Sequence, residues 1–210
     1  MELYFAPLAC SLATRIAFKE AGASASFHQV DPRTKRLADG SDFLAVNPMG
    51  QVPVLRTDDG ELLTENPAVL QYVADRYPSS GLAPLSGMPR YRLQQWLNFV
   101  TSELHKVVFI PLLDPQSGDG AKQFARHKAV HRFAYLNAQL AGRAYLLDRF
   151  TVADAYLITV LNWAAFSGMD LEPFAAVNTY FISLCQRESI AQALAEELAL
   201  YKEQQARRAV

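Results

Sequence analysis

The chain has 210 residues, of which 50% are hydrophobic and 20% charged, and its formal net charge is -1 at pH 7. This length allows one large domain or two ordinary ones. The near-zero net charge gives no electrostatic reason to expect a nucleic-acid partner, because such binding needs a basic surface that releases counterions. With two cysteines and no apolar run of the ~18–20 residues that span a membrane, we expect a cytoplasmic protein with reduced thiols and no membrane contact.

Short strands and helices alternate in the first eighty residues. Apolar runs at 3–6, 26–30, 52–57 and 61–64 predict strands, and helical spacing predicts one helix over 10–20 and another from Asn66 on, with Asn66 as its N-cap. The last two strands are joined by Asp58-Asp59-Gly60, a hairpin signal, and 31–42 is expected to be a polar loop. The order β-α-β followed by β-β-α predicts a small sheet covered by helices in a domain of residues 1–80.

The rest of the chain carries helical patterns only. A stretch rich in Pro, Gly and Ser at 77–89 reads as a linker, and apolar periodicity predicts helices over 93–107, 121–140, 152–166, 174–186 and 189–204. Thr151 and Asp154 form a capping box at the start of the third of these helices, worth about 1 kcal/mol. We therefore expect an all-helical domain over 87–210, and the whole chain to be α+β followed by all-α.

Cys10 is the first candidate for chemistry. With Ser11 it stands where a strand ends and a helix begins, so both residues are expected in the first helical turn. Unpaired backbone N–H groups and the positive end of the helix dipole favour an anion there, and a thiol at such a place should titrate below its free value of about 8.5. The alternative is a small buried residue at a helix start.

Two further candidates come from the same domain. A cis bond between Val52 and Pro53 would turn the backbone of Val52 outward to pair with an extended peptide, although the sequence alone leaves the isomer open. Glu65 and Asn66 begin a helix, where a carboxylate binds well and Glu65 can hold an ammonium group. The alternative is an N-cap with a solvated neighbour, and taken alone it is the stronger reading.

Polar residues also form a row on the long helix expected over 93–107. Asn98, Ser102 and His105 recur at i, i+4 and i+7, opposite the apolar stripe, so they are expected on the solvated face. His105 is the one member that can accept a proton near neutral pH. His127 and His131 lack further ligands in the sequence, so no metal is expected.

The order and spacing of these motifs resemble a known family. The strings are LYFAPLACSLATRIAFKEAG, FLAVNPMGQVPVL, DDGELLTENPAVLQYVADRYP, WLNFVTSELHK and RFTVADAYL. Together they resemble bacterial beta-class glutathione S-transferases essentially end to end. The resemblance implies an N-terminal thioredoxin-like domain at 1–80, a helical domain at 87–210 that contributes a hydrophobic co-substrate site, and a homodimer.

The resemblance also implies a glutathione site with contacts from both domains. The matching positions are Cys10, Lys35, Val52, Pro53, Glu65, Asn66, Asn98, Ser102, Glu103 and His105. In the family pattern Cys10 lies against the glutathione sulfur, Lys35 reaches the glycyl carboxylate and the backbone of Val52 pairs with the cysteinyl part. The chain departs from the pattern at Phe5, often a tyrosine, and at Leu8, often a glycine.

The expected reaction is conjugation of the glutathione thiolate to hydrophobic electrophiles, with Cys10, Ser11 and His105 around the sulfur. Half-ionisation at pH 7 requires the thiol pKa to fall by about 1.5 units, or about 2 kcal/mol, which one charged hydrogen bond and a helix N-terminus can supply without a metal. Two alternatives stay open. One is glutathione-dependent disulfide exchange or reductive dehalogenation through Cys10, and the other is a non-catalytic module that binds glutathione or another ligand.

Overall fold

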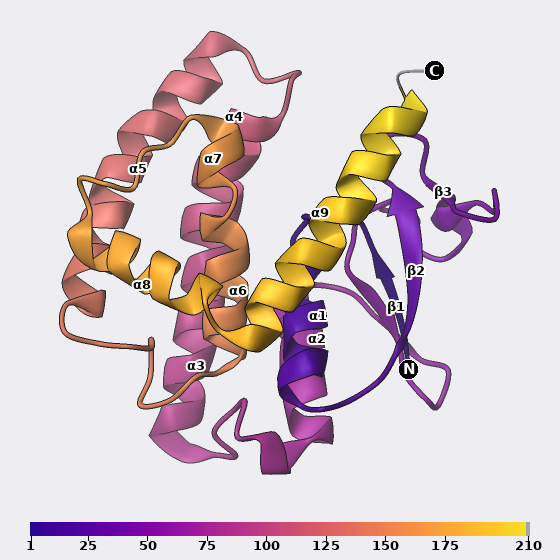
Figure 1. Ribbon diagram of the computed structural model, residues 1–210, viewed down its shortest axis with the longest axis horizontal. Helices are drawn as coiled ribbons and strands as arrows, with labels where there is room; N and C mark the ends of the chain where they lie inside the picture. Colours follow the sequence, from indigo (N-terminus) through magenta and orange to yellow (C-terminus); the bar gives the residue numbers. More distant parts are fainter. Residues whose placement is uncertain (209–210) are drawn as a thin grey trace. The chain divides into compact units, whose positions relative to one another are not determined.

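The computed structural model describes residues 1–208, and the chain divides into two compact units (Figure 1). One unit comprises Met1–Leu82 together with the C-terminal segment that starts at Glu188, and the other is Ala83–Arg187. The sequence led us to expect all residues from 87 on in one domain, whereas the contacts group the last helix with the sheet. The reason is a set of ion pairs between that helix and the first helix, described below.

The first unit is built on a five-stranded mixed sheet. Its strands are β1 (Glu2–Phe5), β2 (Ser26–Asp31), β3 (Arg36–Leu37), β4 (Val54–Arg56) and β5 (Leu62–Leu63), in the order β3-β2-β1-β4-β5. β1 and β2 are parallel, as the intervening helix requires, and the other pairs are antiparallel. Four of the five strands were predicted. β3 was not, because two residues inside a polar loop carry no alternating pattern.

Three helices belong to this unit: α1 (Leu12–Glu20), α2 (Asn66–Arg76) and α9 (Glu188–Arg208). α1 packs against both α2 and α9 (Figure 1), and short 3-10 turns occur at η1 (Phe43–Ala45) and η2 (Pro78–Ser80). Tyr4, Val30, Phe43 and Val54 form a cluster of buried side chains. The thioredoxin-like arrangement expected for the first eighty residues is thus present.

The start of α1 differs from the prediction. Ser11 is the N-cap and Cys10 lies before the helix, not in its first turn. The reason is a tight turn: Leu12 N–H donates to Ala9 at 3.0 Å and Ala13 N–H to Cys10 at 3.2 Å, each spanning three residues instead of four. Similarly, Asn66 is the first helical residue of α2 and Glu65 is its N-cap.

The second unit consists of helices, as expected. They are α3 (Gly87–Phe99), η3 (Val100–Phe109), α4 (Ile110–Leu113), α5 (Asp119–Leu140), α6 (Val152–Leu161), α7 (Ala164–Ser167) and α8 (Ala175–Cys185). α3, η3 and α4 follow one another without a break, and η3 packs against α5 and α6. The helix predicted over 152–166 is divided in two, because the turn at Asn162 and Trp163 separates α6 from α7.

η3 is a π-helical segment of ten residues, and it changes which side chains are buried. Ile110 N–H bonds to the carbonyl of His105, five residues back, so each turn holds more residues than an α-helical turn. The stripe predicted from α-helical spacing placed His105 on the solvated face. In the structure His105 is 6% exposed, whereas Ser102 is exposed. The polar row is therefore split by the local helix geometry.

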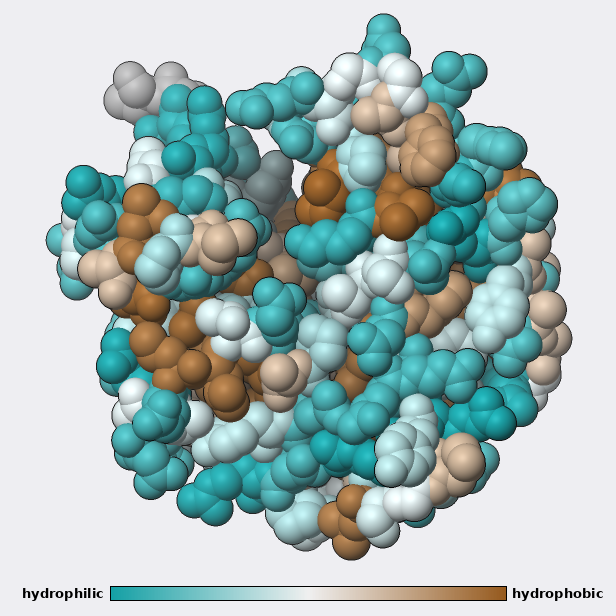
Figure 2. Space-filling model, turned by 180° about the vertical axis from the view of Figure 1, so that it is seen from behind, coloured by the Kyte–Doolittle hydropathy of each residue, from teal (hydrophilic) through white to brown (hydrophobic). Residues whose placement is uncertain are grey.

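No helix in the described part of the chain is both long and apolar enough to cross a membrane. Some large hydrophobic side chains are nevertheless exposed, among them Met49, Leu85 and Phe166. Figure 2 shows hydrophobic residues in small groups among hydrophilic ones on the face that it draws. Scattered apolar exposure of this kind is normal for a globular surface.

Asp154, in the capping box at the start of α6, is a buried carboxylate that accepts several hydrogen bonds. Asp154 is fully buried and accepts from the backbone and hydroxyl of Thr151 at 2.8 and 3.0 Å. It also accepts from Leu146 N–H and from the Tyr180 hydroxyl, both at 2.8 Å. Burial raises the pKa of Asp154, while these donors act in the opposite direction. The carboxylate thus ties α6 to the preceding loop and to α8.

We predict that Asp154→Ala lowers the free energy of unfolding by about 3 kcal/mol or more, well beyond a simple cap, because it leaves several buried donors without an acceptor. Urea denaturation followed by circular dichroism measures the effect. The matched control is Asp148→Ala, an exposed aspartate in the preceding loop, which should change stability by less than about 0.5 kcal/mol. Equal midpoints for the two variants would contradict the prediction.

Candidate active site

Cys10 lies beside the backbone of Val52. Its Sγ donates a hydrogen bond to the Val52 carbonyl at 3.1 Å, and its side chain is only partly buried. The peptide bond between Val52 and Pro53 is cis, the isomer that the sequence alone left open. Because a thiolate has no proton to donate, the contact with Val52 requires the protonated thiol.

The main chain of Val52 is open to a further partner. Among the described residues, none accepts its N–H, and its carbonyl keeps one lone pair beyond the contact with Cys10. Val52 precedes β4 and is partly exposed. A short extended peptide can therefore pair with both backbone groups as an added strand.

The side chain of Lys35 is held by a contact with Gly50, close in sequence to Val52. Its Nζ donates to the Gly50 carbonyl at 2.9 Å, and its side-chain carbons pass 3.2 Å from where a Cβ on Gly50 would lie. Gly50 also has a φ of +61°, which favours glycine. Val52 lies two residues after Gly50, so Gly50 connects Lys35 to the Val52 segment.

The N-terminus of α2 carries the other predicted pair. Glu65 is exposed and has a φ of 65°. The Asn66 side chain is buried and committed to the fold: its amide donates to the Cys10 carbonyl at 3.1 Å and its oxygen accepts from Thr14 at 3.4 Å. The predicted grip by Asn66 on a ligand is thus left to its backbone N–H, while its side chain fixes Cys10.

Left-handed backbone is concentrated at this site. In the described part of the chain, the non-glycine residues with positive φ are Leu8, Lys35 and Glu65. Such conformations cost about 1–3 kcal/mol each and persist where the surrounding structure enforces them, commonly at functional sites. Two of the three are predicted glutathione contacts, and the third is two residues before Cys10.

Ser11 has a structural role in this arrangement. It is fully buried, and its hydroxyl both donates to the Ala6 carbonyl and accepts from the Ala6 N–H at 3.2 Å. It closes the loop between β1 and α1. Since its hydroxyl proton is already bonded to Ala6, Ser11 is no part of the reaction proposed below.

His105 is buried among aromatic rings of the second unit. Its Nδ1 lies 2.7 Å from the Tyr156 hydroxyl, and its ring centroid is 4.8 Å from that of Trp163. Burial, with a smaller contribution from Lys106, lowers the pKa of His105 to about 3. The imidazole is therefore neutral at pH 7, and it is a much weaker base than an unperturbed histidine.

The other predicted contacts from the helical unit do not share one face with His105. Asn98 and Ser102 are exposed and bond back to carbonyls of their own helix, those of Gln94 and Asn98, at 2.8 and 2.9 Å. Glu103 forms an ion pair with Arg132 at 2.6 Å. Their contact with glutathione stays a prediction.

Glu197 is a buried charged residue that the sequence analysis missed. It is 0% exposed, and it contacts Leu8 and Arg15 of the loop and helix around Cys10. A signal was present: Glu197 follows Ile190 and Ala193 at helical spacing on the apolar face of α9, where an acid is out of place.

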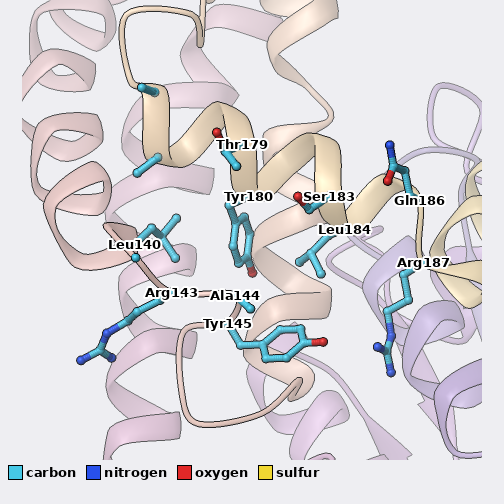
Figure 3. Close-up of a pocket in the computed structure, with 13 residues that line it drawn as sticks. Leu140, Arg143, Ala144, Tyr145, Thr179, Tyr180, Ser183, Leu184, Gln186 and Arg187 are labelled. Carbon is cyan, nitrogen blue, oxygen red and sulfur yellow. The ribbon is translucent and has the colours of Figure 1, made fainter.

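A groove of about 730 Å³ lies in the helical unit, between α8 and the loop after α5 (Figure 3). Arg143 and Arg187 stand near its two ends, and small residues of α8 such as Thr179 and Ser183 form one side. None of the predicted site residues lines it. Within the described residues, no group of three or more His, Cys, Asp or Glu side chains is arranged to hold a metal ion.

Comparison with known proteins identifies the family. Residues 9–76 match the family described as Glutathione S-transferase, N-terminal domain, and residues 100–188 match Glutathione S-transferase, C-terminal domain. Glutathione S-transferase GstA of Escherichia coli O157:H7 is 40% identical over 199 residues, which cover 94% of this chain and 98% of that protein. The chain therefore belongs to the glutathione S-transferase family.

Solved structures of bacterial relatives agree. A sphingomonad glutathione S-transferase complexed with glutathione is 44% identical, with a TM-score of 0.89 over 94% of this chain and 98% of the other. A bacterial beta-class enzyme of Sphingomonas chungbukensis is 42% identical, also with a TM-score of 0.89 and the same coverage. The likeness to bacterial beta-class enzymes that the sequence strings indicated is confirmed.

We predict that Ser11→Ala destabilises the protein by about 1–3 kcal/mol, because the buried Ala6 N–H loses its acceptor. Alkylation of Cys10 in the folded variant should keep the dependence on pH seen in the wild type, since the hydroxyl is not aimed at the thiol. Denaturation curves and alkylation rates provide the two measurements. Unchanged stability with a changed thiol titration would reverse the assignment.

Proposed function

We propose that this chain conjugates the thiolate of glutathione to hydrophobic electrophiles, with glutathione bound along the segment from Lys35 to Val52 and beside Cys10. The observation that carries the proposal is the contact between Cys10 Sγ and the Val52 carbonyl. A tripeptide whose cysteine pairs with the backbone of Val52 places its own sulfur next to Cys10. The sphingomonad relative was solved in complex with glutathione, which supports this ligand.

Each charged group of glutathione then has a counterpart in the first unit. The cysteinyl N–H and C=O pair with Val52, and the glycyl carboxylate pairs with Lys35, which exchanges its contact with Gly50 for the ligand. The γ-glutamyl carboxylate meets the backbone N–H of Asn66 at the N-terminus of α2, and its ammonium group meets Glu65. Because main-chain pairing fixes the register, the sulfur position follows from the backbone alone.

His105 contributes to the reaction as a neutral group in this proposal. With a pKa of about 3 it is not an effective general base at pH 7. Where Nδ1 accepts from the Tyr156 hydroxyl, Nε2 carries the proton and is a hydrogen-bond donor. Donation from a neutral imidazole stabilises a thiolate without introducing a second buried charge. Its place near the sulfur is carried over from the family resemblance.

The remaining partners also belong to the proposal. The helical unit would supply the surface for the hydrophobic electrophile, and the protein would act in the cytoplasm as a homodimer, as the family resemblance implies. Phe109 is fully buried and Trp163 is 6% exposed, both packed in the core, so neither offers a surface for the electrophile. Phe166 is 51% exposed and remains a candidate.

We expect Lys35→Met to weaken glutathione binding by about tenfold or more, since one charge-assisted hydrogen bond is lost. Calorimetry with glutathione and with its glycine amide tests the contact directly: the wild type should bind the amide more weakly, and Lys35→Met should bind both alike. Lys122→Met, a partly exposed lysine of α5, is the control. No heat of binding with wild type and glutathione would refute the proposed function itself.

Conjugation and disulfide exchange differ in their need for Cys10. Conjugation by glutathione forms a thioether and leaves Cys10 unmodified, so Cys10→Ala should keep activity towards electrophiles such as 1-chloro-2,4-dinitrobenzene. Exchange passes through a disulfide between Cys10 and glutathione, with a second glutathione thiolate releasing it, so it is lost in Cys10→Ala. Mass spectrometry of the protein after turnover distinguishes the two outcomes.

A further inference from the structure

Glu197 joins the C-terminal helix to the loop that carries Cys10. One carboxylate oxygen accepts from the backbone N–H of Leu8 at 2.7 Å, and the other accepts from Nε of Arg15 at 2.9 Å. The side chain of Glu197 is 0% exposed. Both oxygens therefore have a donor in a site shielded from water, where such contacts are strong and costly to break.

The guanidinium of Arg15 is itself held in place on several sides. It lies over the rings of Phe5 and Phe27, at 4.6 and 4.1 Å from their centroids, and Nη1 contacts Glu196 at 3.3 Å. Of its two ion pairs, the one with Glu197 is the more buried, because the side chain of Glu197 is 0% exposed and that of Glu196 is 46% exposed. Arg15 thus presents Nε to Glu197 from a fixed position on α1.

The loop from Pro7 to Ser11 depends on such external support. Leu8 has a φ of 60°, a conformation that a leucine adopts rarely, and Ala9 alone separates it from Cys10. At its other end the loop is closed by Ser11 on Ala6. A carboxylate that binds the Leu8 N–H therefore acts on the backbone next to the thiol.

We propose that Glu197 is a positioning residue for Cys10: by binding Leu8 N–H while anchored on Arg15, it holds the loop so that the thiol stays at Val52. The inference rests on the proposed function, in which the sulfur of glutathione docks beside Cys10. It assigns a role at the site to a residue about 190 positions away in sequence, on α9. Glu197 touches no reacting atom.

The ionisation of Glu197 makes this support dependent on pH. Burial raises the pKa of Glu197 to about 7, with a smaller contribution in the same direction from Glu196, whereas Arg15 and the Leu8 N–H lower it. The charged groups around it are Arg15 and Lys19 on α1 and Glu196 on α9. Both oxygens of Glu197 face a hydrogen-bond donor, so the oxygen that takes up a proton can no longer accept from its donor. One contact is then lost as the pH falls below about 7, and the loop loosens.

The experiment compares two neighbouring glutamates in a Cys185→Ser background, so that Cys10 is the one remaining thiol. Glu197→Gln removes the charge and turns one of the two accepting oxygens into an NH2 donor, so Leu8 N–H and Arg15 Nε no longer both have an acceptor. Glu196→Gln makes the same change at a carboxylate that contacts Arg15 but not the loop. The rate of Cys10 alkylation by iodoacetamide is measured between pH 5 and 9. In the parent it should show an inflection near pH 7 besides the ionisation of the thiol. Glu197→Gln should lack it and Glu196→Gln should keep it.

Steady-state kinetics give a second readout. Glu197→Gln should lower kcat/KM for the Cys10-dependent exchange of glutathione mixed disulfides by about tenfold or more through misplacement of the thiol, whereas Glu196→Gln should change it by less than about twofold. A folded Glu197→Gln protein with the parent's pH profile, or equal losses in the two variants, would overturn the proposal. Thermal unfolding shows whether each variant is folded.

If Glu197→Gln does not fold, the wild type itself supplies the test. The amide proton of Leu8, observed by NMR, should shift with a midpoint near pH 7, because a carboxylate acceptor becomes a neutral one. A shift that is constant between pH 5 and 9 would refute the role of Glu197. Alkylation and the amide shift require no glutathione, so failure of the proposed function would show in calorimetry and leave these results interpretable.

Discussion

The conformation of the loop from Pro7 to Ser11 is the constraint on which the rest of the site depends. It places Cys10 against Val52, and three side chains hold it there, one from the loop itself and two from distant parts of the chain. Ser11 closes the loop on Ala6, the Asn66 amide binds the Cys10 carbonyl, and Glu197 binds the Leu8 N–H. The left-handed conformation of Leu8 costs about 1–3 kcal/mol, and a hydrogen bond to a charged group contributes a comparable amount, about 1.5–3 kcal/mol. The contact with Glu197 is thus strong enough to hold a leucine in that conformation.

Elements with a clear period were predictable from the sequence, whereas a very short strand and the start of a helix set by a tight turn were not. β1, α1 and the long helix from Gly87 on follow from apolar spacing, and the hairpin follows from Asp59-Gly60. β3 has only two residues and no pattern. That Cys10 precedes α1 depends on the turn at Ala9, which in turn is closed by Ser11. Both interactions are local, but they depend on turn geometry and on a side-chain hydrogen bond, which the spacing of apolar residues does not reveal.

His105 shows how a local irregularity changes the chemistry of a residue. On an α-helix it would share the exposed face of Asn98 and Ser102, and its pKa would lie near the usual value. The π-helical turns of η3 rotate it into the core, where burial lowers its pKa to about 3. The prediction that His105 matters at the site came from the family resemblance, and its charge state comes only from the structure. A histidine expected as a proton acceptor is thereby limited to the neutral form.

Burial of the ion pair between Arg15 and Glu197 costs desolvation free energy, so its presence needs a reason other than stability. Replacement of a buried ion pair by apolar side chains of similar volume is often neutral or even stabilising, so stability alone does not explain it. An apolar side chain at 197, however, would leave the buried Leu8 N–H without its charged acceptor. The need for that acceptor arises from the loop, since Leu8 turns its N–H away from β1 towards α9. The buried negative charge of Glu197 on α9 then requires a nearby cation, which Arg15 on α1 provides. The ion pair is therefore a consequence of the loop conformation, which ties the C-terminal helix to the position of the thiol.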